Sequence, residues 1–286
     1  MATLMEELET MRALNSLNQT TNKIMQMDLA QINSLLCQRE IDRLLALPEY
    51  QNAKRLEAFG RKVYSQNDED GIIHEIFERI GSTNKRFVEF GVEGGLECNT
   101  HFLLFQGWQG LWLEGSQERY AEICRTFQSA LLHSRLRAQN VFVNKENINA
   151  LLREFQGEID LLSIDIDGND YHIFEAVSVI SPRVVVIEYN AKFPPYINWV
   201  MKYDAAHLWD GSDKCGASLK ALELLGGKKG YQLVGTNLTG VNAFFVRKDL
   251  AAGLFFEPAD AEHLYNPARQ ISFSGGHSAK HFLADF

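Results

Sequence analysis

The chain has 286 residues, of which 45% are hydrophobic and 23% are charged, as expected for a globular protein with a sizeable core. Its formal net charge of -9 argues against a nucleic-acid-binding protein, because that affinity depends on many Lys and Arg contacts to phosphates. We therefore expect one large α/β domain with additions and no nucleic-acid partner.

The N-terminal region and the cysteines indicate a cytoplasmic protein. Glu6, Glu7 and Glu9 stand where a signal peptide has basic and then apolar residues, and no run of about 18 apolar residues could span a membrane. The four cysteines lack metal-binding spacing and suit reduced thiols: Cys37, Cys98, Cys124 and Cys215.

Residues 1–58 are predicted to form an N-terminal helical extension. Apolar residues recur there at spacings of three and four from Leu4 to Leu45, and Pro48 ends the pattern. Two interpretations stay open. The region is either one or two amphipathic helices packed on the main domain, or a hairpin or coiled coil that forms a homodimer.

Residues 59–250 alternate between strand-like and helix-like segments, which predicts a mostly parallel sheet. The expected parallel strands are Arg86–Phe90, Gly110–Glu114, Val141–Val143, Ile159–Ile166 and Val184–Tyr189, and the expected helices are Gly71–Ile80, Cys98–Gln106, Glu118–Leu132, Ile148–Phe155, Tyr171–Val179 and Ser218–Lys229. Only a short loop joins the last two strands, Tyr231–Thr236 and Asn242–Arg247, so this pair must be antiparallel. Residues 251–286 are interpreted as a loop-like C-terminal tail.

A glycine turn follows the first strand. Glu89 lies near the end of that strand, and Gly91 and Gly95 allow the backbone to turn tightly and face a ligand with its N–H groups. Glu114 ends the second strand, where a carboxylate can accept both hydroxyls of a ribose but would repel a pyrophosphate. Two acidic strand ends favour a cationic adenosyl sulfonium over a dinucleotide.

Several motifs in this order resemble the FkbM-like family of class I S-adenosylmethionine-dependent methyltransferases. They are Tyr-Ser-Gln-Asn-Asp-Glu-Asp-Gly (64–71), Val-Glu-Phe-Gly-Val-Glu-Gly-Gly (88–95), Gly-Trp-Gln-Gly-Leu-Trp-Leu-Glu-Gly (107–115), Asp-Leu-Leu-Ser-Ile-Asp-Ile-Asp-Gly-Asn-Asp-Tyr (160–171) and Ile-Glu-Tyr-Asn (187–190). The resemblance implies a Rossmann-like fold with a seven-stranded, mostly parallel sheet and a C-terminal antiparallel hairpin. It also implies S-adenosylmethionine as cofactor, with the Glu89 carboxylate available to its methionine ammonium, Gln66 closing over it and Asn147 near the adenine. Asn147 could equally be a helix N-cap.

The densest group of acidic residues follows the fourth and fifth strands. Asp165 and Asp167 share one side of the chain, Glu188 and Asn190 do likewise, and all lie near the carboxyl edge of the sheet, where open α/β sheets bind ligands. Three interpretations compete. Asp167, Glu188 and Asn190 hold Mg²⁺, or Asp167 or Glu188 acts as a general base without metal, or the group is structural. Asp165 is expected beneath the cofactor.

A long aromatic-rich connection follows the fifth strand and is typical of a lid over a carbohydrate or polyketide-like acceptor. His207 in this connection is a further candidate base. We expect an O-methyltransferase for a hydroxyl of a sugar, polysaccharide precursor or secondary metabolite. The alternatives are a nicotinamide-dependent oxidoreductase, disfavoured by the missing GxGxxG spacing, and a non-catalytic assembly protein.

Overall fold

A computed structural model describes residues 2–273. Seven strands form one sheet in the order β3-β2-β1-β4-β5-β7-β6. The strands are β1 (Arg86–Phe90), β2 (Gln109–Glu114), β3 (Leu136–Asn140), β4 (Gly157–Ile164), β5 (Ile180–Glu188), β6 (Tyr231–Thr236) and β7 (Asn242–Arg247). The first five are parallel, and β7 enters antiparallel between β5 and β6. This confirms the predicted class I methyltransferase layout.

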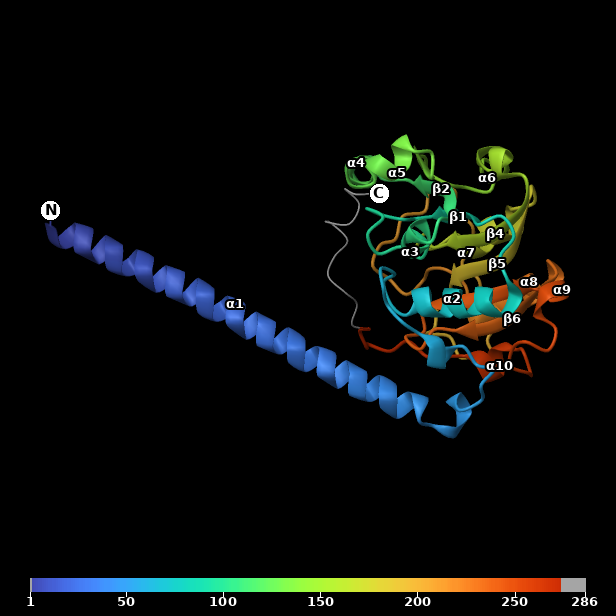
Figure 1. Cartoon of the computed structure of the whole chain (residues 1–286), viewed down its shortest axis with the longest axis horizontal. Helices are drawn as coiled ribbons and strands as arrows, with labels where there is room; N and C mark the ends of the chain where they lie inside the picture. The colour runs from blue at the N-terminus through green and yellow to red at the C-terminus, as the bar shows by residue number, and fades with distance from the viewer. Residues whose placement is uncertain (1, 274–286) are drawn as a thin grey trace.

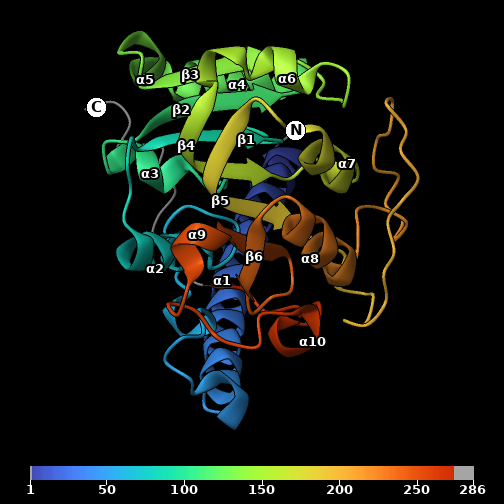
Figure 2. The same ribbon diagram turned by 90° about the vertical axis from the view of Figure 1, so that its right-hand side faces the viewer.

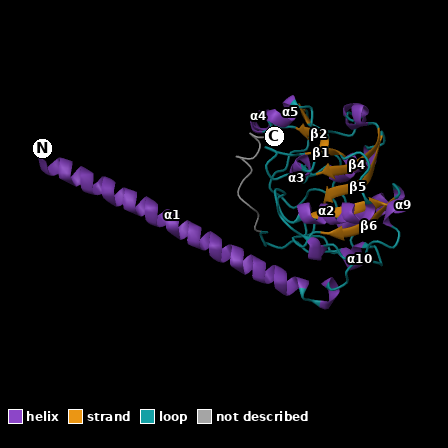
Figure 3. Ribbon diagram, viewed as in Figure 1, coloured by secondary structure: helices purple, strands orange, loops and turns teal. Residues whose placement is uncertain are grey.

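Helices cover both faces of the sheet, so the body has three layers (Figure 2; Figure 3). The helices of the body are α2 (Glu69–Ile80), α3 (His101–Phe105), α4 (Gln117–Thr126), α5 (Gln128–Leu132), α6 (Ile148–Leu151), α7 (Asp170–Ala176), α8 (Leu219–Lys228), α9 (Lys248–Ala251) and α10 (Ala261–Leu264), and α1 (Ala2–Leu45) precedes them. Short 3-10 helices span Pro48–Tyr50, Glu57–Phe59 and Arg153–Phe155. Apolar residues occupy both faces of the central strands, as burial between two helical layers requires.

Alternation along the strands assigns side chains to these layers. In β4, Leu161 packs in the core beside α2 to α5, whereas Leu162 packs in the core beside α6, α7 and α8. Both side chains are fully buried. Two separate apolar cores therefore hold the sheet from either side.

The third strand was predicted at the wrong place. The most apolar segment, Val141–Val143, follows β3, while the strand itself is Leu136–Asn140. Because β3 lies at the edge of the sheet, three of its five residues are exposed, and its sequence lacks the apolar run typical of a central strand. The predicted helix Glu118–Leu132 is divided into α4 and α5 at Phe127.

The two chain ends also differ from expectation. One continuous helix, α1, replaces the packed helices or hairpin, and it extends away from the body (Figure 1). Part of the predicted loop-like tail is ordered on the core, where Ala261 and Leu264 of α10 are fully buried. Residues 274–286 lie outside the described part of the chain. Among the described helices, none combines the length and apolarity needed to cross a membrane.

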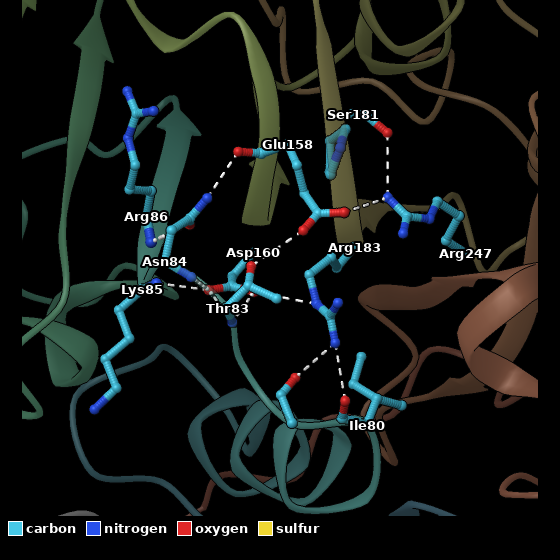
Figure 4. A network of polar contacts seen from close by, with 12 residues as sticks. Ile80, Thr83, Asn84, Lys85, Arg86, Glu158, Asp160, Ser181, Arg183 and Arg247 are labelled. Atoms are coloured by element: carbon cyan, nitrogen blue, oxygen red, sulfur yellow. Dashed lines mark hydrogen bonds and ion pairs between the residues drawn. The ribbon is translucent and has the colours of Figure 1, made fainter.

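Buried charges hold the edge of the sheet at which β1 and β4 begin (Figure 4). The Asp160 carboxylate accepts hydrogen bonds from the backbone N–H groups of Thr83, Asn84 and Lys85, at 2.6 to 3.0 Å. The Arg183 guanidinium lies 3.2 Å from the same carboxylate. This network fixes the loop that leads into β1. Ligands can then bind at the other end of the strands, where their carboxyl ends lie.

Candidate active site

The turn after β1 packs closely against the end of β4, and only glycine fits at position 91. Gly91 has a φ of 70°, and a Cβ on it would lie 1.6 Å from the carbonyl oxygen of Asp165. Gly95 has a φ of 78°, and a Cβ there would lie 2.5 Å from the Trp112 ring. Glu93 takes a left-handed φ of 49°, a conformation that glycine adopts more easily.

A cleft of about 630 Å³ opens beside this turn, within the usual size range of cofactor pockets. It is lined by six of the predicted site residues: Gln66, Glu89, Gly91, Asp165, Asp167 and Glu188. It is also lined by Trp209, Val241 and Asn242, so β4, β5, the lid connection and β7 all contribute. Gly95, Glu114, Asn147, Asn190 and His207 are not among its lining residues.

Glu89 uses its carboxylate to organise the wall of the cleft. It accepts hydrogen bonds from the backbone N–H groups of Asn99 and Thr100 and from the hydroxyls of Thr100 and Ser163, at 2.6 to 3.1 Å. These four bonds occupy the four lone-pair positions of a carboxylate. The hydrogen bonds therefore show a structural function for the Glu89 carboxylate. Its contact with the ammonium group of a cofactor stays a prediction.

Glu114 is buried and accepts two backbone hydrogen bonds, from Ser116 at 2.7 Å and from Glu93 at 2.9 Å. The second bond ties the end of β2 to the glycine turn after β1. Each carboxylate oxygen keeps one further lone pair for a hydroxyl. The assignment of Glu114 to a ribose therefore stays a prediction, and the structure adds that this residue shapes the turn.

Asp165, Asp167 and Glu188 form the carboxylate cluster of the cleft. Each offers an oxygen, and these oxygens all lie within 4.8 Å of one another. Asp167 has a left-handed φ of 56°, and Asp is one of the few non-glycine residues that tolerate this conformation. The next N–H group, that of Gly168, donates to the buried carboxylate of Asp170 at 2.8 Å. Asp170 thus fixes the turn that carries Asp167.

Burial and mutual repulsion keep protons in this cluster. Burial, with the charges of Asp170 and Asp167, raises the pKa of Glu188 to about 8. Burial, followed by the nearby Glu188 carboxylate, raises the pKa of Asp165 well above its ordinary value. At pH 7 a carboxyl with a pKa of about 8 is roughly nine-tenths protonated. Glu188 is therefore a proton-holding group near neutral pH.

A second cavity, of about 260 Å³, adjoins the cleft. Asp167, Glu188, Trp209 and Val241 line both spaces, so the carboxylate cluster stands at their border. Asn190 lines only the second cavity. Its amide group donates to the carbonyl oxygens of Asp213 and Cys215, and its side-chain oxygen accepts the Lys192 N–H. Asn190 holds the lid connection, so its prediction as a metal ligand lacks structural support.

His207 and Asn147 lie apart from the cleft. The His207 ring packs on Gly168, where a Cβ would lie 2.4 Å from it, and its Nε2 lies 3.2 Å from the backbone oxygen of Asp167. It lines a separate cavity of about 680 Å³ with Trp199 and Tyr203. Asn147 closes a local turn by accepting the Asn144 N–H and donating to the Phe142 carbonyl, and it makes no side-chain N-cap bond.

Asn242 is one of the cleft residues that sequence reasoning missed. It is 3% exposed, its amide group donates to Glu69 at 3.0 Å, and its side-chain oxygen has no hydrogen-bond partner in the described part of the chain. The strand pairing places it directly opposite Glu188. The predicted hairpin could have indicated this neighbour, but the register of β7 against β5 is not readable from the sequence.

These residues fit an adenosyl sulfonium cofactor on two grounds. Gly91 lines the cleft at a turn that only glycine fits, and the clustered carboxylates, which have no cationic partner among the described residues, suit a cation. The donor set of Asp165, Asp167 and Glu188 also suits a hard divalent cation, since such ions prefer carboxylate oxygens.

Comparisons with solved structures find methyltransferases. The METTL16 MTase domain aligns at 16% identity, covering 42% of this chain and 51% of that one, with a TM-score of 0.32. An O-methyltransferase from Bacillus cereus in complex with SAH aligns at 17% identity over 60% and 76%, with a TM-score of 0.42. A SAM-dependent methyltransferase from Aquifex aeolicus aligns at 10% identity over 73% and 97%, with a TM-score of 0.39.

The chain thus spans about half the length of the first of these structures. With TM-scores below 0.5, the likenesses say nothing about the chemistry of this chain. No curated protein matches it by sequence. The family model described as the methyltransferase FkbM domain matches residues 104–219, a range that runs from the end of α3 to the start of α8. Residues 104–219 are thus similar to the methyltransferase FkbM domain.

Proposed function

We propose that this protein transfers a methyl group from S-adenosylmethionine to a hydroxyl of a sugar, a polysaccharide precursor or a secondary metabolite. The observation that carries the proposal is the shared border of the two cavities. Asp167 and Glu188 line both the 630 Å³ cleft and the 260 Å³ cavity. A hydroxyl group bound in the smaller cavity would lie next to a carboxylate that can accept its proton and next to a cofactor bound in the cleft.

The cleft is the proposed cofactor site. Gly91 and Gln66 line it, and the carboxylate of Asp165 provides a counter-charge. When bound, S-adenosylmethionine would supply an electrophilic methyl group on a positively charged sulfur. The chain's own contribution is alignment of the hydroxyl with that group and exclusion of water, which supplies much of the rate of such displacements.

Glu188 is the proposed general base. Its pKa of about 8 lies near working pH, where a positioned base is most effective. A cation in the cleft would favour the ionised form of this carboxyl and so prepare it to accept the hydroxyl proton. Asp167 is proposed to bind the hydroxyl beside it. His207 is a weaker candidate, because it lines another cavity.

The smaller cavity limits the acceptor. Its volume corresponds to that of about nine liquid water molecules, enough for one small ring with its substituents. Trp209 is 57% exposed and lines this cavity, so its ring can cover an acceptor face, while the carboxylates and Asn190 oxygens accept hydroxyl hydrogen bonds. This chemistry favours a polyhydroxylated acceptor over an anionic one.

Transfer of labelled methyl groups to a panel of sugars and hydroxylated metabolites tests the proposal. Glu188→Gln and Asp167→Asn should each lower turnover about 10²-fold or more with S-adenosylhomocysteine affinity nearly unchanged. Glu118→Gln, at an exposed carboxylate of α4, is the matched control. Full activity in both site variants would contradict the assignment.

A chelator separates the two functional interpretations of the carboxylates. If Asp167 and Glu188 hold Mg²⁺, it would acidify the acceptor hydroxyl, and EDTA should abolish turnover until Mg²⁺ is restored. If Glu188 takes the proton directly, EDTA should have no effect. We expect indifference to EDTA, because Asn190, the third predicted ligand, is engaged in the lid.

A further inference from the structure

The helix α1 leaves the body of the protein with its apolar side chains uncovered (Figure 1). Ten large apolar residues on it are 53% to 66% exposed: Met11, Leu14, Leu17, Ile24, Met25, Met27, Leu29, Ile32, Leu35 and Leu36. Every described side chain from Met11 to Asn33 is exposed. A helix that stays in water does not normally expose so many large apolar side chains.

Among the described residues, the contacts of α1 with the main domain come from its last turns. Cys37, Ile41 and Leu44 are 3% to 7% exposed, and Ile41 and Leu44 pack with Tyr50 and Leu238. The rest of the helix has little support of its own, because Asn, Ser and Thr, which form helices poorly, are frequent in residues 15–22 and return at Asn33 and Ser34. Long helices in water depend on packing of an apolar face for their stability.

One line of residues on this helix follows the spacing of a coiled-coil seam. The positions alternate by four and three over their whole length: Met11, Asn15, Asn18, Asn22, Met25, Leu29, Ile32 and Leu36. Leu14 and Leu35 flank the seam. The seam is thus apolar at both ends and carries three consecutive Asn layers in the middle.

We propose that α1 pairs with α1 of a second copy of this chain as a parallel, in-register coiled coil. A buried Asn amide needs a partner that both donates and accepts hydrogen bonds, and the same Asn of a second copy provides one. Asn at seam positions is a known means of fixing register and strand number. Three such layers select a copy of the same helix over an unrelated apolar partner.

Charge and size also favour a second copy. Residues 11–36 carry only Arg12, Lys23 and Asp28 as charged residues, so a copy meets little repulsion. A membrane surface would need a basic polar face, which this segment lacks. In a pair of such helices the seam and its flanking positions, about four of every seven residues, meet the partner, so residues 11–36 provide roughly 15 residues a side.

The Asn layers also decide the direction of pairing. In a parallel pair each Asn faces its own counterpart. In the antiparallel alignment that overlaps the segment fully, Met11 would face Leu36, while Asn15, Asn18 and Asn22 would face Ile32, Leu29 and Met25, so every seam amide would be buried against an apolar side chain. The parallel pair is therefore preferred, and it brings both catalytic domains to the same end of the coil.

The seam is open to a partner even where α1 meets its own domain. Leu36 is 59% exposed, whereas Cys37, the next residue, is 7% exposed and faces the domain. Successive residues are about 100° apart around a helix. The partner helix can therefore lie beside the contact between α1 and the domain without displacing it.

Light scattering of the full chain and disulfide trapping test this inference. Wild type should have the mass of a dimer, Ile32→Lys should be a monomer, and Met27→Lys should stay a dimer, because Met27 is equally exposed but lies opposite the seam. Under mild oxidation Leu29→Cys should form a cross-linked dimer at least tenfold faster than Met27→Cys, with wild type as background for the native cysteines.

Three results would overturn the inference. The first is a monomeric wild type at tens of micromolar, and the second is a dimer that Ile32→Lys leaves intact. The third is antiparallel pairing, in which Leu36→Cys cross-links to Met11→Cys in a mixture while Leu29→Cys does not cross-link to itself. None of these readouts depends on methyl transfer, so the outcome is independent of the proposed function.

Discussion

Replacement of Glu188 by Gln should make the protein more stable at alkaline pH than wild type. Burial and the neighbouring carboxylates raise the pKa of Glu188 from 4.5 to about 8 in the folded chain. The folded state therefore binds this proton more tightly than the unfolded state. The stability that the protonated carboxyl provides is complete below the unfolded pKa and is lost as pH rises toward 8.

The two pKa values set the size of the effect. Their difference corresponds to at most about 5 kcal/mol, and we expect about 2–4 kcal/mol because Asp165 and Asp167 share the repulsion. Gln is neutral at all these pH values. The free energy of unfolding of Glu188→Gln, minus that of wild type, should therefore grow by this amount between about pH 5 and pH 9.

Urea unfolding of both proteins across this pH range measures the difference. Glu118→Gln serves as the control, because this exposed carboxylate of α4 belongs to no cluster among the described residues, and its difference from wild type should stay flat. A difference for Glu188→Gln that does not change with pH would refute the conclusion that the cleft holds a buried proton on this carboxyl.

Three further substitutions test other parts of the site and the fold. Gly91→Ala should lower affinity for S-adenosylhomocysteine at least tenfold by calorimetry, because its Cβ would lie 1.6 Å from the Asp165 carbonyl oxygen; full affinity would show that the turn is not the cofactor cradle. Glu114→Ala should weaken the same binding by about 1.5–3 kcal/mol, and an unchanged affinity would remove this residue from the site. Asp160→Asn should cost about 3 kcal/mol of stability in urea unfolding, with ligand affinity retained in the remaining folded protein, since it disrupts a buried ion pair at the opposite edge; a loss below about 1 kcal/mol would contradict this.

The central sheet was predictable because strands buried between two helical layers have nearly continuous apolar sequences. Strands β1, β2, β4 and β5 are apolar on both faces, and the short loop between β6 and β7 forces an antiparallel pair. The edge strand β3 has one exposed face and lacks such a sequence. The N-terminal helix was predictable as well, but sequence spacing alone does not show whether the apolar face of α1 has a partner.

The site was predictable as a set of carboxylates but not as a geometry. Strand ends identified Asp165, Asp167 and Glu188, which the fold brings together at the cleft. Sequence could not reveal that Asn190 holds the lid connection or that Asn242 stands opposite Glu188, because both depend on register and on loop paths. It also could not show that the carboxylates of Glu89 and Glu114 accept hydrogen bonds from backbone N–H groups.

Calorimetric titration of the full chain with S-adenosylhomocysteine, S-adenosylmethionine and NAD tests the central claim most directly. The claim is that the cleft between the glycine turn and the carboxylate cluster binds an adenosyl sulfonium cofactor. We predict one-to-one binding of both adenosyl ligands in the micromolar range and no binding of NAD. Binding of NAD alone, or of none of the three at millimolar concentration, would contradict the account.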